Sequence, residues 1–199
     1  MKAIKRGLVV FLILALFIPL TAQASSAPHF PDVPDDAPYA DAVNTLADMG
    51  IVKGDENGNF NPDSTITRAE FATMMCRVLG VEDQALTITQ SSFTDVPVGH
   101  WACGYITEAV NLGLVNGYGD GRFGPSDTLT YQQAVKVLVC AWGYGDDAIM
   151  AGGWPDGYIS VANDLGFTQG TATSASDIPR SIVAILIYNA LKIGGNSAQ

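Results

Sequence analysis

Phe30-Pro31-Asp32-Val33-Pro34 recurs as Phe93-Thr94-Asp95-Val96-Pro97, 63 residues further along the chain. The same offset relates seven further pairs without a gap: Gly50 to Gly113, Gly54 to Gly117, Gly58 to Gly121, Phe60 to Phe123, Pro62 to Pro125, Thr67 to Thr130 and Gly80 to Gly143. An ungapped register of this length indicates an internal repeat.

A third copy of the repeat is shorter and weaker. Trp154, Tyr158, Gly166 and Gly170 match Trp101, Tyr105, Gly113 and Gly117 at an offset of 53 residues, and Ile178-Pro179-Arg180 then aligns with Ile66-Thr67-Arg68. This copy lacks the Phe-x-Asp-Val opening. The sequence therefore predicts three units, at residues 29–85, 92–147 and 150–194, of which the last is degenerate.

Each unit has the apolar spacing of two helices joined by a loop. The first helix of the first unit ends at a glycine, and a turn-rich loop occupies residues 55–62. The second helix is expected to begin at Thr67 and to bury Phe71, Met74, Met75, Val78 and Leu79 along one stripe. Because one pair of helices cannot cover its own stripe, we predict an all-α fold in which three helix-loop-helix repeats share a single core.

The N-terminus has the features of a secretory signal peptide. Lys2, Lys5 and Arg6 precede an apolar run over residues 8–20, and Ala22-Gln23-Ala24 offers the small residues that a signal peptidase accepts. Residues 1–24 are therefore expected to be removed, and no later segment reads as a transmembrane helix. Only residues 194–199 follow the last expected helix, so no cargo domain is predicted.

The charge of the chain is strongly acidic. The full chain carries a formal net charge of −10, and loss of residues 1–24 removes three of the ten basic residues and none of the twenty acids, which lowers it to −13. This balance argues against nucleic acid as a partner. An anionic ligand would have to be bound by a local basic site.

The cysteines Cys76, Cys103 and Cys140 are odd in number and widely spaced. This excludes a disulfide framework and a CxxC zinc site. Two alternatives stay open: three buried thiols, or a bridge between Cys103 and Cys140.

Thr67-Arg68-Ala69-Glu70 has the pattern of a capping box, in which the Thr hydroxyl and the Glu carboxylate bind amides at the start of a helix. Thr130 and Gln133 preserve the pattern in the second unit without the arginine. Arg68 lies in the first helical turn, where the helix dipole disfavours a cation. Beside free helix amides, its guanidinium could bind a carboxylate; the alternative is a solvated surface arginine.

Two further sets of repeated residues have a structural explanation. Gly54, Gly117 and Gly170 are expected to have positive φ where a helix ends. Asp32 and Asp95 precede Val-Pro ahead of a helix, where an Asx turn or N-cap is the default.

Trp101 and Trp154 begin the first helices of the second and third units, where aromatic rings more often belong to the core. No catalytic motif is present, and the only histidines are His29 and His100. The loop that begins at Asp55 lacks the glycine and glutamate that a calcium-binding EF-hand requires. No catalytic residue, metal ion or cofactor is predicted.

The chain resembles the S-layer homology domains that occur as triplets in bacterial surface proteins. The resemblance covers residues 29–194 and rests on Phe-x-Asp-Val, on the Phe-x-Pro motif, and on Gly50-Ile-Val-Lys-Gly54, Gly113-Leu-Val-Asn-Gly117 and Ile66-Thr-Arg-Ala-Glu70. It implies a pseudo-threefold helical module that binds a peptidoglycan-linked secondary cell-wall polysaccharide, often with pyruvylated sugars, in grooves between adjacent repeats.

The resemblance also implies a set of carbohydrate-binding residues. Arg68 is expected to be the main contact and Arg180 a second, whereas Tyr131 departs from the arginine of the family. The remaining implied contacts are Gly54 and Gly117, which would let a sugar approach the backbone, Asp32 and Asp95, which would bind ligand hydroxyls, and Trp101 and Trp154, which would stack on sugar rings.

The function that follows is a non-catalytic, secreted module of the cell wall or cell surface whose partner is a secondary cell-wall polysaccharide or peptidoglycan. One alternative is a surface scaffold that has lost most glycan sites and binds a protein partner. A glycan-cleaving enzyme would require two carboxylates that face each other at about 5–10 Å.

Overall fold

The computed structural model describes residues 30–172 and 177–196, and the predicted signal peptide, residues 1–24, lies outside this range. The described residues form eight helices and no sheet: α1 (Ala40–Asp48), α2 (Arg68–Val78), α3 (Glu82–Thr87), α4 (Cys103–Asn111), α5 (Tyr131–Ala141), α6 (Gly145–Met150), α7 (Asp156–Asp164) and α8 (Arg180–Asn196). The prediction of an all-α fold is confirmed. The short helices α3 and α6 were not predicted.

Both predicted capping boxes are present. The Thr67 hydroxyl accepts the Glu70 amide at 3.2 Å while the Glu70 carboxylate accepts the Thr67 amide at 2.8 Å. At the start of α5, Thr130 and Gln133 make the same reciprocal pair. Glutamate and glutamine therefore serve equally as the cap, because both offer a side-chain oxygen to the N-cap amide.

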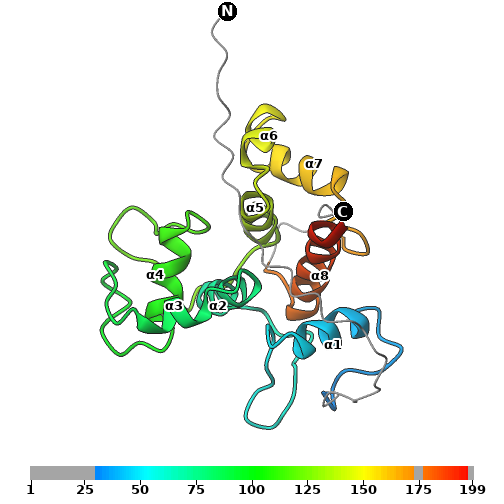
Figure 1. Cartoon of the computed structure of the whole chain (residues 1–199), viewed down its shortest axis with the longest axis horizontal. Helices are drawn as coiled ribbons and strands as arrows, with labels where there is room; N and C mark the ends of the chain where they lie inside the picture. Colours follow the sequence, from blue (N-terminus) through cyan, green and yellow to red (C-terminus); the bar gives the residue numbers. More distant parts are fainter. Residues whose placement is uncertain (1–29, 173–176, 197–199) are drawn as a thin grey trace, which may run out of the picture.

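The helices pair across the boundaries of the predicted units. The first helix of a unit packs against the second helix of the preceding unit: α4 packs against α2, and α7 packs against α5. The order closes on itself, because α1 of the first unit packs against α8 of the last. Figure 1 shows the resulting three arms, with α3 beside α4 and α6 beside α7. The order helix, loop, helix is as expected, but the two helices of one unit are not each other's main packing partners.

The segments that lead into α2, α5 and α8 meet at the centre. Isolated β-bridges join Thr67 to Thr128, Thr130 to Asp177, and Thr65 to Pro179. Each of the three segments is therefore bonded to both others. A pseudo-threefold relation between complete repeats, and the bounds of those repeats, stay predictions.

The buried residues form two clusters, so the expectation of a single core is wrong. Helix α2 contributes to both: Phe71 and Met75 belong to the cluster that also contains buried residues of α1, α5 and α8, while Ala72 and Cys76 belong to the cluster with buried residues of α3 and α4. The three cysteines are free thiols, which decides against a bridge between Cys103 and Cys140.

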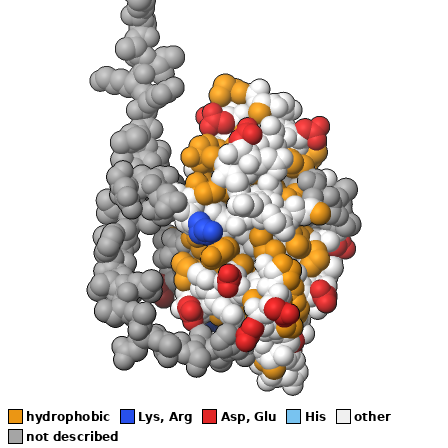
Figure 2. Space-filling model, turned by 90° about the vertical axis from the view of Figure 1, so that its right-hand side faces the viewer, with side chains coloured by type: hydrophobic (Ala, Val, Ile, Leu, Met, Phe, Trp, Pro, Cys, Tyr) orange, Lys and Arg blue, Asp and Glu red, His pale blue; other side chains and the backbone are white. Residues whose placement is uncertain are grey.

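The surface agrees with the acidic composition. On the face drawn in Figure 2, acidic side chains lie scattered between apolar ones, and basic side chains are scarce. Among the described residues, no helix has the length and apolar character needed to cross a bilayer.

Candidate functional site

A groove lies where the loop of the first unit meets the start of α8. We call it the first groove; it encloses about 370 Å³, a size suited to a small ligand. Its lining comes from three units: Ile51, Val52, Lys53, Gly54, Asp55, Asn61, Ser64, Thr65, Glu70, Thr73, Met74 and Arg77 from the first, Trp101 from the second and Arg180 from the third.

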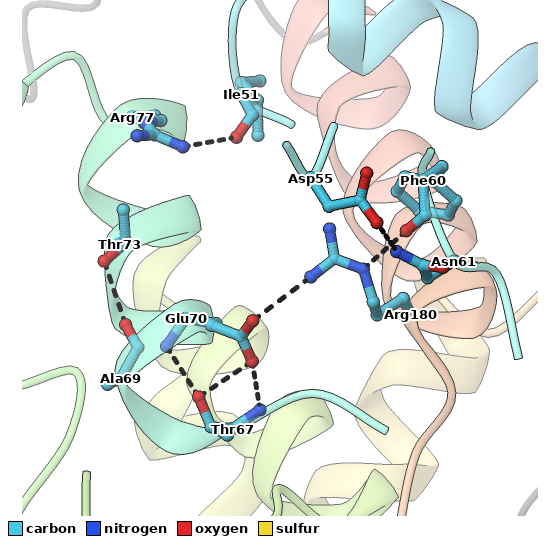
Figure 3. A network of polar contacts seen from close by, with 10 residues as sticks. All are labelled: Ile51, Asp55, Phe60, Asn61, Thr67, Ala69, Glu70, Thr73, Arg77 and Arg180. Atoms are coloured by element: carbon cyan, nitrogen blue, oxygen red, sulfur yellow. Dashed lines mark hydrogen bonds and ion pairs between the residues drawn. The ribbon is translucent and has the colours of Figure 1, made fainter. Parts of the chain in front are cut away.

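Arg180 is held in this groove by the loop of the first unit. Its Nε donates to the carbonyl oxygen of Phe60 at 2.9 Å, and its guanidinium carbon lies 5.1 Å from the centre of the Phe60 ring. Its Nη1 lies 3.6 Å from a Glu70 carboxylate oxygen. Figure 3 shows the guanidinium pointing into the space between α2 and this loop. Of the predicted site residues, Arg180, Gly54 and Trp101 are thus brought together.

Four charged residues of the first groove were missed as site residues by the sequence reasoning: Lys53, Asp55, Glu70 and Arg77. Glu70 was recognised only as a cap, although its second oxygen faces Arg180. Arg77 donates to the carbonyl oxygen of Ile51 at 3.3 Å and forms an ion pair with Glu82 at 2.9 Å. Its position three turns along the helix carried no motif, so no signal in the sequence could have indicated it.

Asp55 is committed to its own loop. Its carboxylate accepts the amides of Asn57 and Asn59 and the side-chain amide of Asn61. These bonds, with that from Asn61 the strongest influence, lower the pKa of Asp55.

Arg68 has the same relation to the loop of the second unit, and we call this region the second groove. Its Nε donates to Phe123 O at 3.0 Å and its Nη2 to Asn116 O at 2.7 Å. The Phe123 and Tyr118 rings lie 4.5 and 5.0 Å from its guanidinium carbon. Arg68 is only 8% exposed, which decides against a solvated surface arginine, and no hydrogen bond from its Nη1 is present among the described residues.

The helix amides beside both arginines are not free, which corrects the expectation made for Arg68. The Arg68 amide donates to Asp127 O, and the Arg180 amide donates to Ser64 O, each at 2.9 Å. A carbonyl oxygen of a neighbouring segment thus accepts a hydrogen bond from the backbone amide at the start of each helix. An anion would have to be bound by the guanidinium itself.

The position of the arginine in the second unit is occupied by Tyr131. Its hydroxyl lies 3.0 Å from the Thr171 hydroxyl in the loop of the third unit. Tyr131 therefore also contacts the loop of another unit, but through a neutral hydroxyl in place of a guanidinium.

Gly54 and Gly117 do not have positive φ, so that expectation is wrong for both and holds for Gly170, with φ of 76°. They are required for close approach instead. A Cβ on Gly117 would lie 2.4 Å from the Phe93 ring, and one on Gly54 would lie 3.1 Å from the Phe30 ring. Glycines with positive φ stand just after the helices, at Gly50 and Gly113.

Asp32 and Asp95 clamp the loops rather than form local Asx turns or N-caps. Asp95 accepts the amides of Phe123 and Gly124, both at 2.8 Å, and Asp32 accepts the corresponding amides of Phe60 and Asn61. Burial raises the pKa of Asp95, but the two amides outweigh it and the net shift is downward. A contact with ligand hydroxyls stays a prediction for both residues.

Trp101 and Trp154 are exposed, at 60% and 52%, so the expectation that they belong to the core is wrong. Trp101 lines the first groove. Trp154 lies under the ammonium group of Lys136, which is 5.6 Å from its ring centre. Lys136 occupies in α5 the position that Thr73 occupies in α2, and the sequence reasoning missed it.

Comparison with known families supplies the identity of the repeat. The S-layer homology domain matches residues 29–72 and residues 92–135. Two segments of the chain are therefore similar to the S-layer homology domain. Each begins at or just before a Phe-x-Asp-Val motif and ends within a capped helix, α2 or α5. A third S-layer homology domain at residues 150–194 stays a prediction.

Three relatives of the chain are named as surface or cell-wall proteins. It is 37% identical over 197 residues to the "Cell surface protein" of Thermoanaerobacter kivui, 35% over 159 residues to the "Middle cell wall protein" of Brevibacillus brevis, and 32% over 194 residues to the "Surface layer protein" of Brevibacillus choshinensis. These alignments cover 97%, 79% and 96% of this chain but 25%, 15% and 17% of the relatives. The chain therefore spans a quarter or less of their length.

The S-layer homology domains and these relatives indicate a cell-wall-anchoring module at the cell surface or in the cell wall, which confirms the predicted location. One more distant relative, at 26% identity, is named "Amylopullulanase", and the match covers 9% of it. A segment similar to this chain can thus be a small part of a protein that is named as an enzyme.

Proposed function

We propose that the chain attaches non-covalently to a peptidoglycan-linked secondary cell-wall polysaccharide and that the first and second grooves are its ligand sites. The observation that carries this proposal is the repeated construction of the two grooves. In each groove, the Nε–H of an arginine donates to the carbonyl oxygen of a phenylalanine in the loop of another unit. Each groove also has an exposed tryptophan, Trp101 in the first and Trp154 in the second.

The chemistry of these parts suits a sugar with an acidic substituent. A guanidinium whose orientation is fixed by carbonyl acceptors keeps its remaining N–H groups available for a carboxylate, such as that of a pyruvate ketal. Exposed tryptophan rings offer apolar faces to pyranose rings. Gly54 lines the first groove, and the absence of a Cβ at Gly54 and Gly117 lets the Phe30 and Phe93 rings pack against the two loops.

A non-catalytic role fits the carboxylates of the first groove. Glu70 is bonded to Thr67 and faces Arg180, and Asp55 is bonded to three asparagines of its loop. Carboxylates that are engaged in this way are poorly placed to share a proton with a glycosidic oxygen.

Sedimentation with purified cell-wall sacculi tests this function. The wild-type protein should sediment with intact sacculi and remain in solution once the secondary polymer has been removed. Arg180→Gln should reduce retention several-fold, whereas Lys192→Gln, which removes the same charge from the exposed side of α8, should not. A folded wild-type protein that ignores intact sacculi would refute the proposal.

A protein-binding scaffold is the second candidate. Leu86, Val98 and Trp101 are exposed apolar side chains around a second hollow of about 340 Å³ between α3 and α4. If wall retention survives removal of the polymer but is lost in Leu86→Ser, this candidate replaces the first.

A further inference from the structure

Of the residues at which the two grooves differ, one has the same structural role in both; the others include Lys53 and Arg77 of the first groove, where the second unit has Asn116 and Cys140. Glu70 and Gln133 are the third residues of their helices, and each closes its capping box. The cap itself does not depend on the charge, because a side-chain oxygen is present in both cases. Capping therefore places no requirement on the charge of this residue, and the charge can differ between the two grooves.

In the first groove this charge is directed at the arginine. The Glu70 oxygen that is not used by the cap lies 3.6 Å from Arg180 Nη1, and Arg77 is already paired with Glu82. A ligand carboxylate that approaches Arg180 therefore meets a carboxylate that is already there, and the two repel each other.

In the second groove the corresponding residue, Gln133, is neutral. Among the residues that the structure describes, no carboxylate lies within ion-pair distance of Arg68. Asp127, which corresponds to Ser64 of the first groove, accepts the Tyr118 hydroxyl at 2.7 Å. Lys136, one turn beyond Gln133, adds a second cation above the exposed ring of Trp154.

We propose that the third residue of the capping box sets the ligand selectivity of each groove, so that the second groove favours an acidic sugar over a neutral one more strongly than the first groove does. This inference rests on the proposed function of the two grooves. Lys136 is the second cationic contact for the acidic substituent. The Glu70 carboxylate makes the first groove tolerant of sugars without such a substituent.

The test exchanges the two caps, since glutamate and glutamine both support the helix. Glu70→Gln is made in an Arg68→Gln background, which leaves the first groove in use, and Gln133→Glu in an Arg180→Gln background, which leaves the second. Isothermal titration calorimetry then measures two probes: a methyl N-acetylhexosaminide with a 4,6-pyruvate ketal, and the same glycoside without it. Thermal unfolding of each variant confirms that the cap is retained.

The expected result is a change in the ratio of acidic to neutral affinity. Glu70→Gln should raise this ratio about two- to fivefold, and Gln133→Glu should lower it by a similar factor, as expected for a partly exposed charge pair. Lys136→Gln should weaken binding of the ketal without changing that of the neutral glycoside.

Two other results would overturn the inference in distinguishable ways. If both exchanges leave the ratio unchanged while Arg180→Gln and Arg68→Gln each still reduce wall retention, the inference fails and the proposed function stands. If the wild-type protein binds neither glycoside nor sacculi, both fail.

Discussion

Arg68 Nε donates a hydrogen bond to the carbonyl oxygen of Phe123 at 3.0 Å, and the ring of the same phenylalanine lies 4.5 Å from the guanidinium carbon. Phe123 thus orients Arg68 through its backbone and its side chain together. Because the two residues belong to different units, this arginine holds the units together as well as facing the second groove. Its replacement should affect stability and binding at once.

Arg68→Ala should lower the free energy of unfolding by about 1.5–3 kcal/mol, because two carbonyl oxygens lose a charged donor. Arg180→Ala should cost less, since Arg180 donates to one carbonyl and its side chain is more exposed. Urea unfolding followed by circular dichroism measures both. Equal stability of Arg68→Ala and the wild-type protein would contradict this account of the contact.

Gly117→Ala should destabilise the protein by about 1–3 kcal/mol or more, because its Cβ would lie 2.4 Å from the Phe93 ring and 2.6 Å from Arg122 O. Gly54→Ala should cost less, since its nearest contact is 3.0 Å. Thermal unfolding of the matched pair gives the comparison. The reverse order of the two melting temperatures would show that the second loop adapts more easily than its packing suggests.

Asp95 should make stability sensitive to acid. Burial raises its folded pKa, but the hydrogen bonds from the Phe123 and Gly124 amides, together with smaller effects that include the nearby Arg122 charge, leave this pKa lowered. The stabilisation is therefore present above the unfolded pKa, about 3.9, and is lost as the pH falls through the folded value. Asp95→Asn should lose about 1 kcal/mol at pH 7 and should show a smaller further decrease between pH 5 and pH 3.

The control for this pH prediction is Asp120→Asn. In the wild-type protein the Asp120 carboxylate pairs with the exposed Arg122 and anchors no distant loop. Its melting temperature at pH 7 should stay close to that of the wild-type protein. If the stability of Asp95→Asn and of the wild-type protein falls identically with decreasing pH, protonation of Asp95 does not contribute to acid destabilisation.

Cys76 should be unreactive in the native protein. Burial, assisted by the carboxylates of Glu108 and Glu82, raises the pKa of its thiol to about 12. At pH 8 the thiolate is scarce, and the side chain is fully buried. Ellman's reagent should therefore detect Cys76 only as fast as the protein unfolds, while all three thiols react in urea; fast labelling of native Cys76 would contradict the burial.

The local features of the fold could be predicted from the sequence because their causes are local. The capping boxes at Thr67 and Thr130 depend on residues three apart, and the register of the repeat is visible in the glycines and phenylalanines alone. The alignment of Ile178-Pro179-Arg180 with Ile66-Thr67-Arg68 placed the two arginines at corresponding positions, and both lie beside the loop of another unit.

The pairing of helices could not be predicted, because helical spacing shows that a face is apolar without showing which helix covers it. The packing of α1 against α8 depends on residues more than 130 positions apart. Helices α3 and α6 have six residues each, too few for a periodic pattern. The roles of Gly54 and Glu70 likewise depend on what another part of the chain brings beside them.

The bond between Arg180 and Phe60 has a consequence for the order in which the protein is made. The loop that forms most of the first groove is synthesised about 120 residues before the arginine that completes it. During export, as during synthesis, the early loop emerges without its guanidinium. The first groove is therefore incomplete on any chain whose last helix has not yet been released, whereas the contact between Arg68 and Phe123 can form earlier.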